Sequence, residues 1–286
     1  MLELIMPIKR KIQKYFWEFF WNDFQLPQID VDDLYPINVQ ELPSITERLC
    51  IPPYKGDQTL KDFSFLISLV KHKNPNIVLE LGTAHGTTVA NICAVCGAKI
   101  YTVNALAEET EGYNITFSLT KDEIGYVYRK NGYADRVVQI YENTRNLKIL
   151  DWVDPKSVEF VIIDACHDAE FVVNDFLKIL PSLSDDAIVL FHDTNPSLEK
   201  HCIDSYIGCM YLRKLGFKVN HLKESSWGVW LSEKATYQLP FFKKLRNAAY
   251  TVIGFLLFGN QEKNIQMFRW LASGFLLGKF NHTETV

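Results

Sequence analysis

Residues 76–88 (NIVLELGTAHGTT) constrain the fold of this chain more than any other stretch. Ile77, Val78, Leu79 and Leu81 form a short apolar run, which is typical of a strand that is buried on both faces. Gly82 and Gly86 follow, and glycine lets a backbone bend sharply or approach a ligand closely. The residues after Gly86 can continue as a helix, whose first N–H groups suit an anion. The stretch predicts a binding turn between a strand and a helix, although an ordinary connection would have a similar pattern.

Strand and helix patterns alternate after residue 56. Strands are expected at 76–82, 99–104, 136–141, 157–164, 187–192, 217–222 and 227–231, and helices at 57–73, 86–96, 120–130, 144–150, 167–180 and 197–215. This alternation predicts an α/β fold with a mostly parallel seven-stranded sheet, a closing antiparallel strand and helices on both faces. Ligands of such sheets bind beyond the carboxyl ends of the strands. The polar residues expected there are Glu80, Asn104, Glu142, Asn143, Asp164 and Asp193.

Two of these strand ends combine a carboxylate with a histidine. Asp164 is followed by His167, and Asp193 is preceded by His192. Two convergent carboxylates suit a hard divalent cation, and a neutral imidazole can take a proton from a hydroxyl near physiological pH. The alternative is structural, because Asp164 could cap the following helix and the histidines could be hydrogen-bonded parts of the core.

The three motifs together resemble a known family. The order Glu80-x-Gly82-x-x-x-Gly86, Asp164-x-x-His167 and His192-Asp193 is similar to that of class I S-adenosylmethionine-dependent methyltransferases. Within that class it resembles the small-molecule O-methyltransferases, which include the catechol, caffeoyl-CoA and macrolide-sugar enzymes. The resemblance covers about residues 57–233 and implies a three-layer, Rossmann-like fold. It also implies S-adenosylmethionine as cofactor and methyl transfer to a hydroxyl of a sugar or secondary metabolite.

The resemblance also implies roles for individual residues. His167 would take the proton of the acceptor hydroxyl, and Asp164 would be the second catalytic residue. A divalent cation such as Mg²⁺ would bind Asp164, Asp193 and Thr194. The residues implied to hold the cofactor are Glu80, Gly82, Thr83, Ala84, Gly86, Asn104, Asn143 and Asp164.

This sequence departs from the family pattern at two places. Asn104 stands where an acidic residue usually binds the ribose, and Glu108 or Glu109 could take over that contact. Thr194 stands where catechol-type enzymes have an asparagine, which puts the third metal ligand in doubt. These departures are the features that speak for an alternative function, a catalytically inactive scaffold that binds the cofactor and assembles through its hydrophobic ends. The plausible base and the two carboxylates argue against it. A nicotinamide-dependent oxidoreductase is a further alternative, but its G-x-G-x-x-G fingerprint is absent.

Aromatic residues are frequent in segment 105–134, which is long for a connection between two strands. We expect this segment to form part of a lid over the acceptor, or else to pack as an ordinary aromatic helix. The aromatic side chains are Tyr113, Phe117, Tyr126, Tyr128 and Tyr133.

The two ends of the chain differ from its middle. Residues 1–56 are predicted to form an amphipathic helix and a proline-rich linker, residues 57–235 the cofactor-binding domain, and residues 236–286 an apolar and basic helical extension. The net charge of −4 combines basic ends with an acidic middle, which argues against a nucleic-acid-binding core.

The apolar runs at 248–258 and 267–277 are too short to span a bilayer. We expect them to form a homo-oligomer interface or, alternatively, to lie on an anionic membrane surface. The N-terminus lacks the pattern of a secretory signal. The predicted location is therefore the cytoplasm, with peripheral contact at the inner membrane face as the second expectation. The predicted partner is a small-molecule hydroxyl acceptor.

Overall fold

The computed structural model describes residues 26–34, 39, 41–110, 117–194 and 203–232. The predicted terminal helices at 5–22, 248–258 and 267–277 lie outside these residues. The chain divides into two compact units, one of which comprises Pro27–Cys209 and Val219–Lys234 and contains the whole sheet. The other unit includes Leu26 and Met210–Lys218. Among the helices in the described ranges, none combines the length and hydropathy that crossing a membrane requires.

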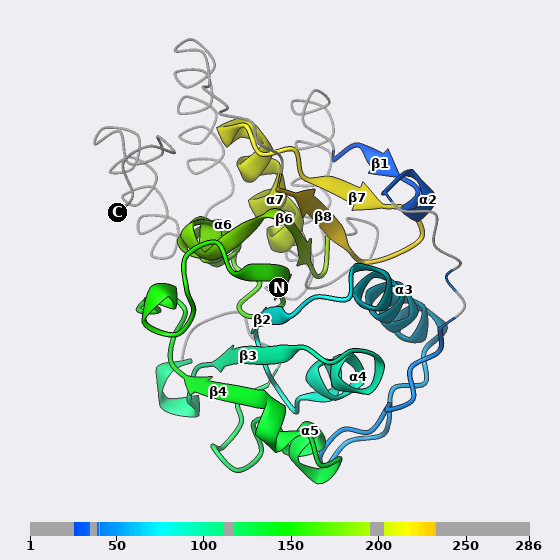
Figure 1. The fold of residues 1–286 in the computed structure, drawn as a ribbon, viewed down its shortest axis with the longest axis vertical. Coiled ribbons are helices and arrows are strands. Elements are labelled where there is room, and N and C mark those ends of the chain that lie inside the picture. The colour runs from blue at the N-terminus through cyan, green and yellow to red at the C-terminus, as the bar shows by residue number, and fades with distance from the viewer. Residues whose placement is uncertain (1–25, 35–38, 40, 111–116, 195–202, 233–286) are drawn as a thin grey trace, which may run out of the picture. The chain divides into compact units, whose positions relative to one another are not determined.

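Eight strands form one sheet in the order β1-β7-β8-β6-β5-β2-β3-β4 (Figure 1). Neighbouring strands are parallel except for β8, which runs antiparallel to both β6 and β7. The strands are β1 (Gln28–Ile29), β2 (Ile77–Leu81), β3 (Lys99–Asn104), β4 (Val137–Tyr141), β5 (Val158–Ile163), β6 (Leu183–Phe191), β7 (Asn220–Leu222) and β8 (Gly228–Leu231). The predicted mostly parallel α/β sheet with a closing antiparallel strand is confirmed. The additional strand, β1, is only two residues long and lies in the proline-rich linker, so its sequence gives no strand pattern.

Helices cover both faces of this sheet, with α3, α4 and α5 on one face and α6 on the other (Figure 1). The helices are α2 (Val31–Leu34), α3 (Asp57–Lys73), α4 (Thr87–Val95), α5 (Tyr126–Lys130), α6 (Ala169–Ile179) and α7 (Ile203–Leu215). Helix α5 begins later than the predicted residue 120, because Gly125 has a left-handed φ of 73° and caps the helix there. The helix predicted at 144–150 is instead a single 3₁₀ turn, Ile149–Asp151.

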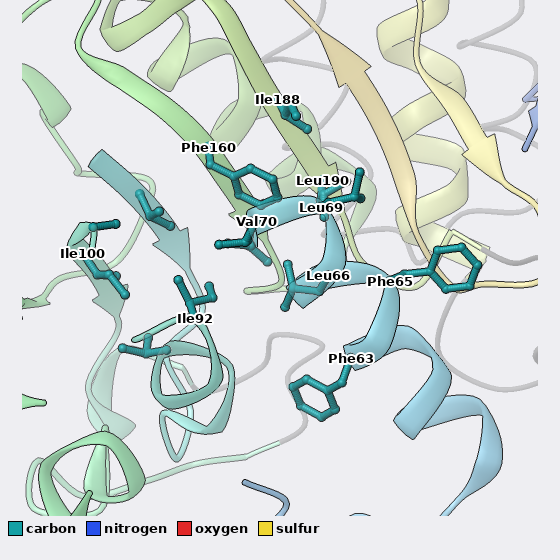
Figure 2. Packing of buried hydrophobic residues seen from close by; sticks show 14 of the residues in the cluster. Phe63, Phe65, Leu66, Leu69, Val70, Ile92, Ile100, Phe160, Ile188 and Leu190 are labelled. Atoms are coloured by element: carbon teal, nitrogen blue, oxygen red, sulfur yellow. The ribbon is translucent and has the colours of Figure 1, made fainter. Parts of the chain in front are cut away.

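The core between α3 and the sheet holds the site in place. Leu66, Leu69 and Val70 of α3 have no exposed surface, and they belong to one buried cluster with Phe160 of β5 and Ile92 of α4 (Figure 2). Replacing one such leucine by alanine would cost about 2–5 kcal/mol. Strand β2 pairs with β3 on one side and with β5 on the other. The loops that follow these three strands are therefore brought together at one edge of the sheet.

Candidate active site

A cavity of about 270 Å³ lies at the carboxyl ends of the strands. The loops after β2, β3, β4, β5 and β6 all contribute to its wall, and a segment before α3 completes it. Residues from these loops that line it include Gly82, Thr83, Ala84, Gly86, Asn104, Glu109, Asn143, Asp164, His167, His192 and Asp193. Of the six polar strand-end residues identified in the sequence, Glu80 and Glu142 do not line the cavity.

Two positions in the turn after β2 have room only for glycine. Gly82 has φ +106°, and a Cβ atom there would overlap the backbone carbonyl of Asp164. Gly86 has φ +81°, and a Cβ atom there would lie 2.7 Å from a ring carbon of Tyr128. Ala84, between them, also has a positive φ of 44°. The turn is thereby pressed against the end of β5, so that the binding loop and Asp164 share one wall.

Asn104 holds this turn from the neighbouring strand. Its side-chain oxygen accepts a hydrogen bond from the Ala84 N–H at 2.9 Å, and its amide nitrogen donates to the carbonyl of Ala105 at 2.7 Å. Asn104 lines the cavity, yet both ends of its amide already have backbone partners. An asparagine can make this pair of contacts, whereas a carboxylate cannot donate to a carbonyl.

Glu80 lies behind the turn. Its side chain is 1% exposed and accepts a hydrogen bond from the Thr102 hydroxyl at 2.5 Å. Burial raises the pKa of Glu80 to about 8, against the opposing effect of the Thr102 hydrogen bond. The hydroxyls of Thr102 and Thr83 are 2.6 Å apart, and Thr83 lines the cavity. Glu80 therefore supports the cavity wall through two threonines, and its own carboxyl group is not part of that wall.

Glu109 and Asn143 lie together on another part of the wall. The Asn143 amide nitrogen lies 3.5 Å from the backbone carbonyl of Glu109. One carboxylate oxygen of Glu109 accepts from the N–H of Leu106 at 3.2 Å. Among Glu108 and Glu109, named above as substitutes for the missing acidic residue, only Glu109 lines the cavity.

Two carboxylates and two imidazoles meet at the ends of β5 and β6. Nε2 of His167 lies 3.4 Å and Nδ1 of His192 lies 3.2 Å from the same Asp164 oxygen, Oδ1. Asp193 contacts both rings, at 3.6 Å from Nδ1 of His167 and 3.3 Å from Nδ1 of His192. Asp193 has a left-handed φ of 57°, a strained conformation for a residue other than glycine. We call these four residues the Asp–His cluster.

Each charge in the Asp–His cluster stabilises its opposite. Burial alone would lower the pKa of His192, but the charges of Asp164 and Asp193 outweigh it and raise that pKa to about 10. Burial likewise opposes protonation of His167, and the hydrogen bond and charge of Asp164 leave its pKa above the usual value. Burial would raise the pKa of Asp164, yet both histidines hold it well below its usual range. At neutral pH the cluster therefore holds ionised Asp164 beside protonated His192.

This arrangement does not fit the predicted Mg²⁺ site. Magnesium prefers octahedral oxygen ligands, whereas here imidazoles occupy the space beside both carboxylates. The hydroxyl of Thr194 lies 3.0 Å from Nδ1 of His221 and donates to the carbonyl of Ser226, and Thr194 does not line the cavity. Within the part of the chain that the structure describes, no group of three or more His, Cys, Asp or Glu side chains is placed to hold a metal ion.

Part of the predicted lid segment also reaches the cavity. Phe117 lines it and packs edge-on against His85, with ring centroids 4.8 Å apart. Tyr126 and Tyr133 pack instead against the hydrophobic core, and Tyr128 is 3% exposed within it. Tyr113 lies outside the described residues. Three of the five aromatic residues therefore pack in the ordinary way that we gave as the alternative to a lid.

The sequence did not point to Arg48 and Tyr54, which complete the wall. Both belong to the stretch predicted as a proline-rich linker. The guanidinium of Arg48 stacks over the Tyr54 ring at 4.0 Å. No periodicity or motif marks these residues, because a long-range contact places them.

Comparison with known families agrees with this geometry. A family model described as a methyltransferase domain matches residues 79–194. This segment is a methyltransferase domain. The match runs from β2 through the residue that follows the Asp–His cluster, and so contains all three motifs on which the resemblance to class I methyltransferases depends. That prediction is confirmed. A comparison with curated proteins found no match.

Solved structures with a similar arrangement have sequences that differ widely from that of this methyltransferase domain. A methyltransferase from Podospora anserina bound to S-adenosylhomocysteine is 16% identical, over 62% of this chain and 79% of that one, with a TM-score of 0.45. A putative caffeoyl-CoA O-methyltransferase from Staphylococcus aureus is 14% identical over 63% and 85%, with a TM-score of 0.46. An O-methyltransferase from Bacillus cereus is 15% identical over 63% and 82%, with a TM-score of 0.43. At this distance the likenesses carry no inference about what this chain binds.

Proposed function

We propose that this chain transfers a methyl group from S-adenosylmethionine to a hydroxyl of a small molecule such as a sugar or secondary metabolite. The observation that carries the proposal is the contact between the glycine turn and Asp164, the residue after β5. This contact puts a potential ligand-binding loop and the Asp–His cluster in one cavity. Methyl transfer needs both parts, because the accepting oxygen must meet the methyl carbon in line and must lose its proton.

The cofactor would lie along the turn of Gly82, Thr83, Ala84 and Gly86, with Glu109 and Asn143 near its ribose. The bound sulfonium supplies both the methyl group and the leaving group. Beyond that, the protein has to orient the acceptor and exclude water. Phe117 and Tyr54 give the cavity apolar and aromatic walls that suit this task.

His167 is our proposed base. Its Nε2 lies 3.4 Å from Asp164 and is hydrogen-bonded to it, whereas its Nδ1, at 3.6 Å from Asp193, makes only a longer charge contact. Asp164 thus fixes the ring and leaves Nδ1 to accept the proton of the hydroxyl. His192, whose pKa is raised to about 10, stays protonated and balances the charge of Asp164.

Ligand binding is the first test. Calorimetric titration of the full chain with S-adenosylmethionine and S-adenosylhomocysteine, with NAD as the control, should show micromolar binding of the two sulfur ligands alone. Glu109→Gln should weaken that binding, and Glu108→Gln should not, because only Glu109 lines the cavity. A folded protein that binds neither sulfur ligand would refute the proposal. Binding without methyl transfer to any hydroxyl in an acceptor panel would favour the inactive scaffold.

Metal assistance stays a prediction from the family resemblance. The donor set around Asp164 and Asp193 does not fit Mg²⁺, so we assign no step to a metal. Activity that is lost with EDTA and restored by magnesium would confirm the metal prediction. Activity that is insensitive to EDTA would leave the hydroxyl to be activated by the Asp–His cluster alone.

Homo-oligomerisation and peripheral membrane contact at the inner face of a cytoplasmic membrane are also proposals. They are supported by the apolar and basic pattern of the chain ends. Mass measurement and liposome co-sedimentation of the full chain would test them. Replacing Lys243, Lys244 and Arg246 by glutamate should abolish sedimentation with anionic liposomes if the membrane proposal holds, and should leave it unchanged otherwise.

A further inference from the structure

Trp227, a buried residue directly before β8, contacts the Asp–His cluster from outside the cavity. Its ring and that of His192 have centroids 4.5 Å apart, with their planes inclined at 57°. His192 lines the cavity, whereas Trp227 is 4% exposed and does not line it. Such a contact stabilises an imidazole in either charge state, because a neutral ring packs against the indole and a protonated ring is also attracted to its electron-rich face. Trp227 therefore supports one member of the cluster from behind.

The indole of Trp227 is fixed to α3. Its Nε1 donates a hydrogen bond to the backbone carbonyl of Asp62 at 2.9 Å. The carboxylate of Asp62 accepts from the N–H of Ser226 at 2.8 Å and from the amide of Gln58 at 3.0 Å. Asp62 is 5% exposed and Ser226 is 2% exposed, so these hydrogen bonds are stronger than they would be in water. Asp62 thus holds Trp227 through its main chain and the residue before Trp227 through its side chain.

The turn that joins β7 to β8 also fixes Thr194, two positions after His192. The N–H of Thr194 donates to the carbonyl of Ser226 at 2.9 Å, and the Thr194 hydroxyl donates to the same carbonyl at 3.2 Å. Asp193 lies between His192 and Thr194 and has the strained φ of 57°. A strained conformation persists only where the surrounding structure fixes it. Ser226 and Trp227 contact the residues on the two sides of Asp193, so this turn supports the strained backbone.

Rotation of the His192 ring would change the whole Asp–His cluster. Its Nδ1 lies 3.2 Å from Oδ1 of Asp164 and 3.3 Å from Oδ1 of Asp193, so one ring orientation serves both carboxylates. Oδ1 of Asp164 also contacts Nε2 of His167, our proposed base, at 3.4 Å. A smaller side chain in place of Trp227 would leave room for the His192 ring to turn. Asp164 would then keep one imidazole partner in place of two, and the surroundings of the base would change.

We propose that Trp227 is a positioning residue of this site, whose indole keeps the His192 ring turned towards Asp164 and Asp193. The proposal deepens the proposed function and rests on it, because that function assigns proton transfer to the cluster that Trp227 supports. Trp227 does not line the cavity, so its effect should appear in kcat and not in the affinity for the cofactor.

Trp227→Met tests this role, because it removes the ring and leaves a flexible apolar side chain that fills part of the space. With an active acceptor, kcat should fall by roughly 10- to 100-fold, the scale of a misplaced catalytic group. Calorimetry of the full chain should show unchanged affinity for S-adenosylhomocysteine. Trp227→Phe keeps an aromatic face but loses the hydrogen bond to Asp62, and should recover part of kcat.

Trp230→Met is the matched control. Trp230 lies on β8, three positions further on, and packs against Phe176 of α6 with ring centroids 5.1 Å apart. Its loss should lower thermal stability and leave kcat unchanged. Equal loss of kcat in the two methionine variants overturns the proposal, and so does a wild-type kcat in folded Trp227→Met. A loss confined to KM or to S-adenosylhomocysteine affinity overturns it as well.

Asp62 supplies a second pair of variants, which decides the matter if Trp227→Met does not fold. Asp62→Asn keeps a side-chain oxygen that can accept from the N–H of Ser226, and Asp62→Ala does not. The kcat of Asp62→Ala should therefore fall, while that of Asp62→Asn should stay close to the wild type. Equal kcat values in these two variants would overturn the anchoring of Trp227 by α3.

The ring nitrogens of His192 test the proposal without any acceptor. Correlation spectra of isotope-labelled histidine distinguish a hydrogen-bonded ring nitrogen from a free one, and the spectrum of His192→Gln assigns the signal. The Nδ1 shift of His192 should change in Trp227→Met and stay unchanged in Trp230→Met.

Failure of the proposed function has a separate signature, because the wild-type protein would then bind neither S-adenosylmethionine nor S-adenosylhomocysteine. In that case the nitrogen shift alone decides whether Trp227 holds His192 in place. An unchanged His192 signal in Trp227→Met overturns the positioning role whether or not the protein binds the cofactor.

Discussion

Nε2 of His167 lies 3.4 Å from Oδ1 of Asp164, three positions earlier in the chain. Because Asp164 directly follows β5 and His167 comes three positions later in the same loop, a short connection holds the two side chains together. The ring is 9% exposed, so only a ligand inside the cavity can reach it. The pair is therefore suited to move a proton at one defined atom.

Replacing His167 by glutamine tests this role. Loss of a positioned base typically lowers the rate by about 10²- to 10⁴-fold, so kcat should fall by that range while S-adenosylhomocysteine binds as before. The readout is release of S-adenosylhomocysteine in the presence of an active acceptor. His72→Gln, an exposed histidine of α3, serves as the control. An unchanged kcat would remove His167 from the reaction.

The pH dependence of the rate gives a separate prediction. The pKa of His167 is raised above 6.5 by Asp164, so the base is protonated at low pH and becomes competent as pH rises through that raised value. The wild-type kcat should therefore increase with pH, with its midpoint above 6.5. The His167→Gln variant should lack this rise. A wild-type rate that is highest at acidic pH would contradict the assignment.

Alanine substitutions at Gly82 and Gly97 should have contrasting effects on stability. Gly82→Ala puts a methyl group onto the carbonyl of Asp164 at a φ of +106°, whereas a Cβ atom at Gly97 would meet nothing within 4 Å. We expect Gly82→Ala to lower the free energy of unfolding by about 2–4 kcal/mol. Gly97→Ala should stay close to the wild type. Thermal melts of both variants, with S-adenosylhomocysteine titration of the folded protein, measure the difference.

The buried carboxyl of Glu80 predicts how stability depends on pH. Its pKa is raised to about 8 in the folded protein, against an ordinary value of 4.5. Between these values the folded state binds a proton that the unfolded state has released, so the stability contributed by Glu80 falls as pH rises. Glu80→Gln carries no titratable proton. Its unfolding free energy should therefore decline less than that of the wild type between pH 5 and 8, which thermal or urea unfolding would measure.

A wild-type curve parallel to that of Glu80→Gln would contradict the raised pKa. Asp175→Asn supplies a comparison, because burial also raises the pKa of Asp175, to about 7. Its effect should begin and end at lower pH than that of Glu80→Gln, although the two pH ranges overlap. Only the decline from about pH 7 to about pH 8 should then depend on Glu80 and not on Asp175.

Sequence patterns predicted the strands of the sheet because strands and helices show as local periodicity. The residues at the strand ends followed from those strands. The patterns placed Asp164, His167 and Asp193 in one cleft, and the structure brings these residues together. They could not give the direction of the Glu80 side chain. Glu80 stands opposite Thr102 in the paired strands, and that pairing turns its carboxyl group behind the wall. The direction of the Thr194 side chain likewise depends on its contacts with His221 and the Ser226 carbonyl, which lie far along the chain.

Arg48 was outside the reach of pattern reasoning for a different reason. Its position depends on the hydrogen bonds between Ile45 and Asn91, which are 46 positions apart. The stretch around it has neither the period of a helix nor that of a strand. The short strand β1 was missed on the same grounds. Such segments are located by what they attach to, which a single sequence does not display.

The close approach of Gly82 to the backbone of Asp164 also limits how this chain can change in evolution. At Gly82 the loop after β2 meets the loop after β5 without room for a methyl group, so a residue inserted at this contact would have to displace the other loop. The segment after β3 contributes Glu109 and Phe117 to the cavity, and neither of these residues takes part in the contact between Gly82 and Asp164. New acceptor preferences are therefore expected to arise through lengthening and exchange in that segment, while the paired loops keep their length.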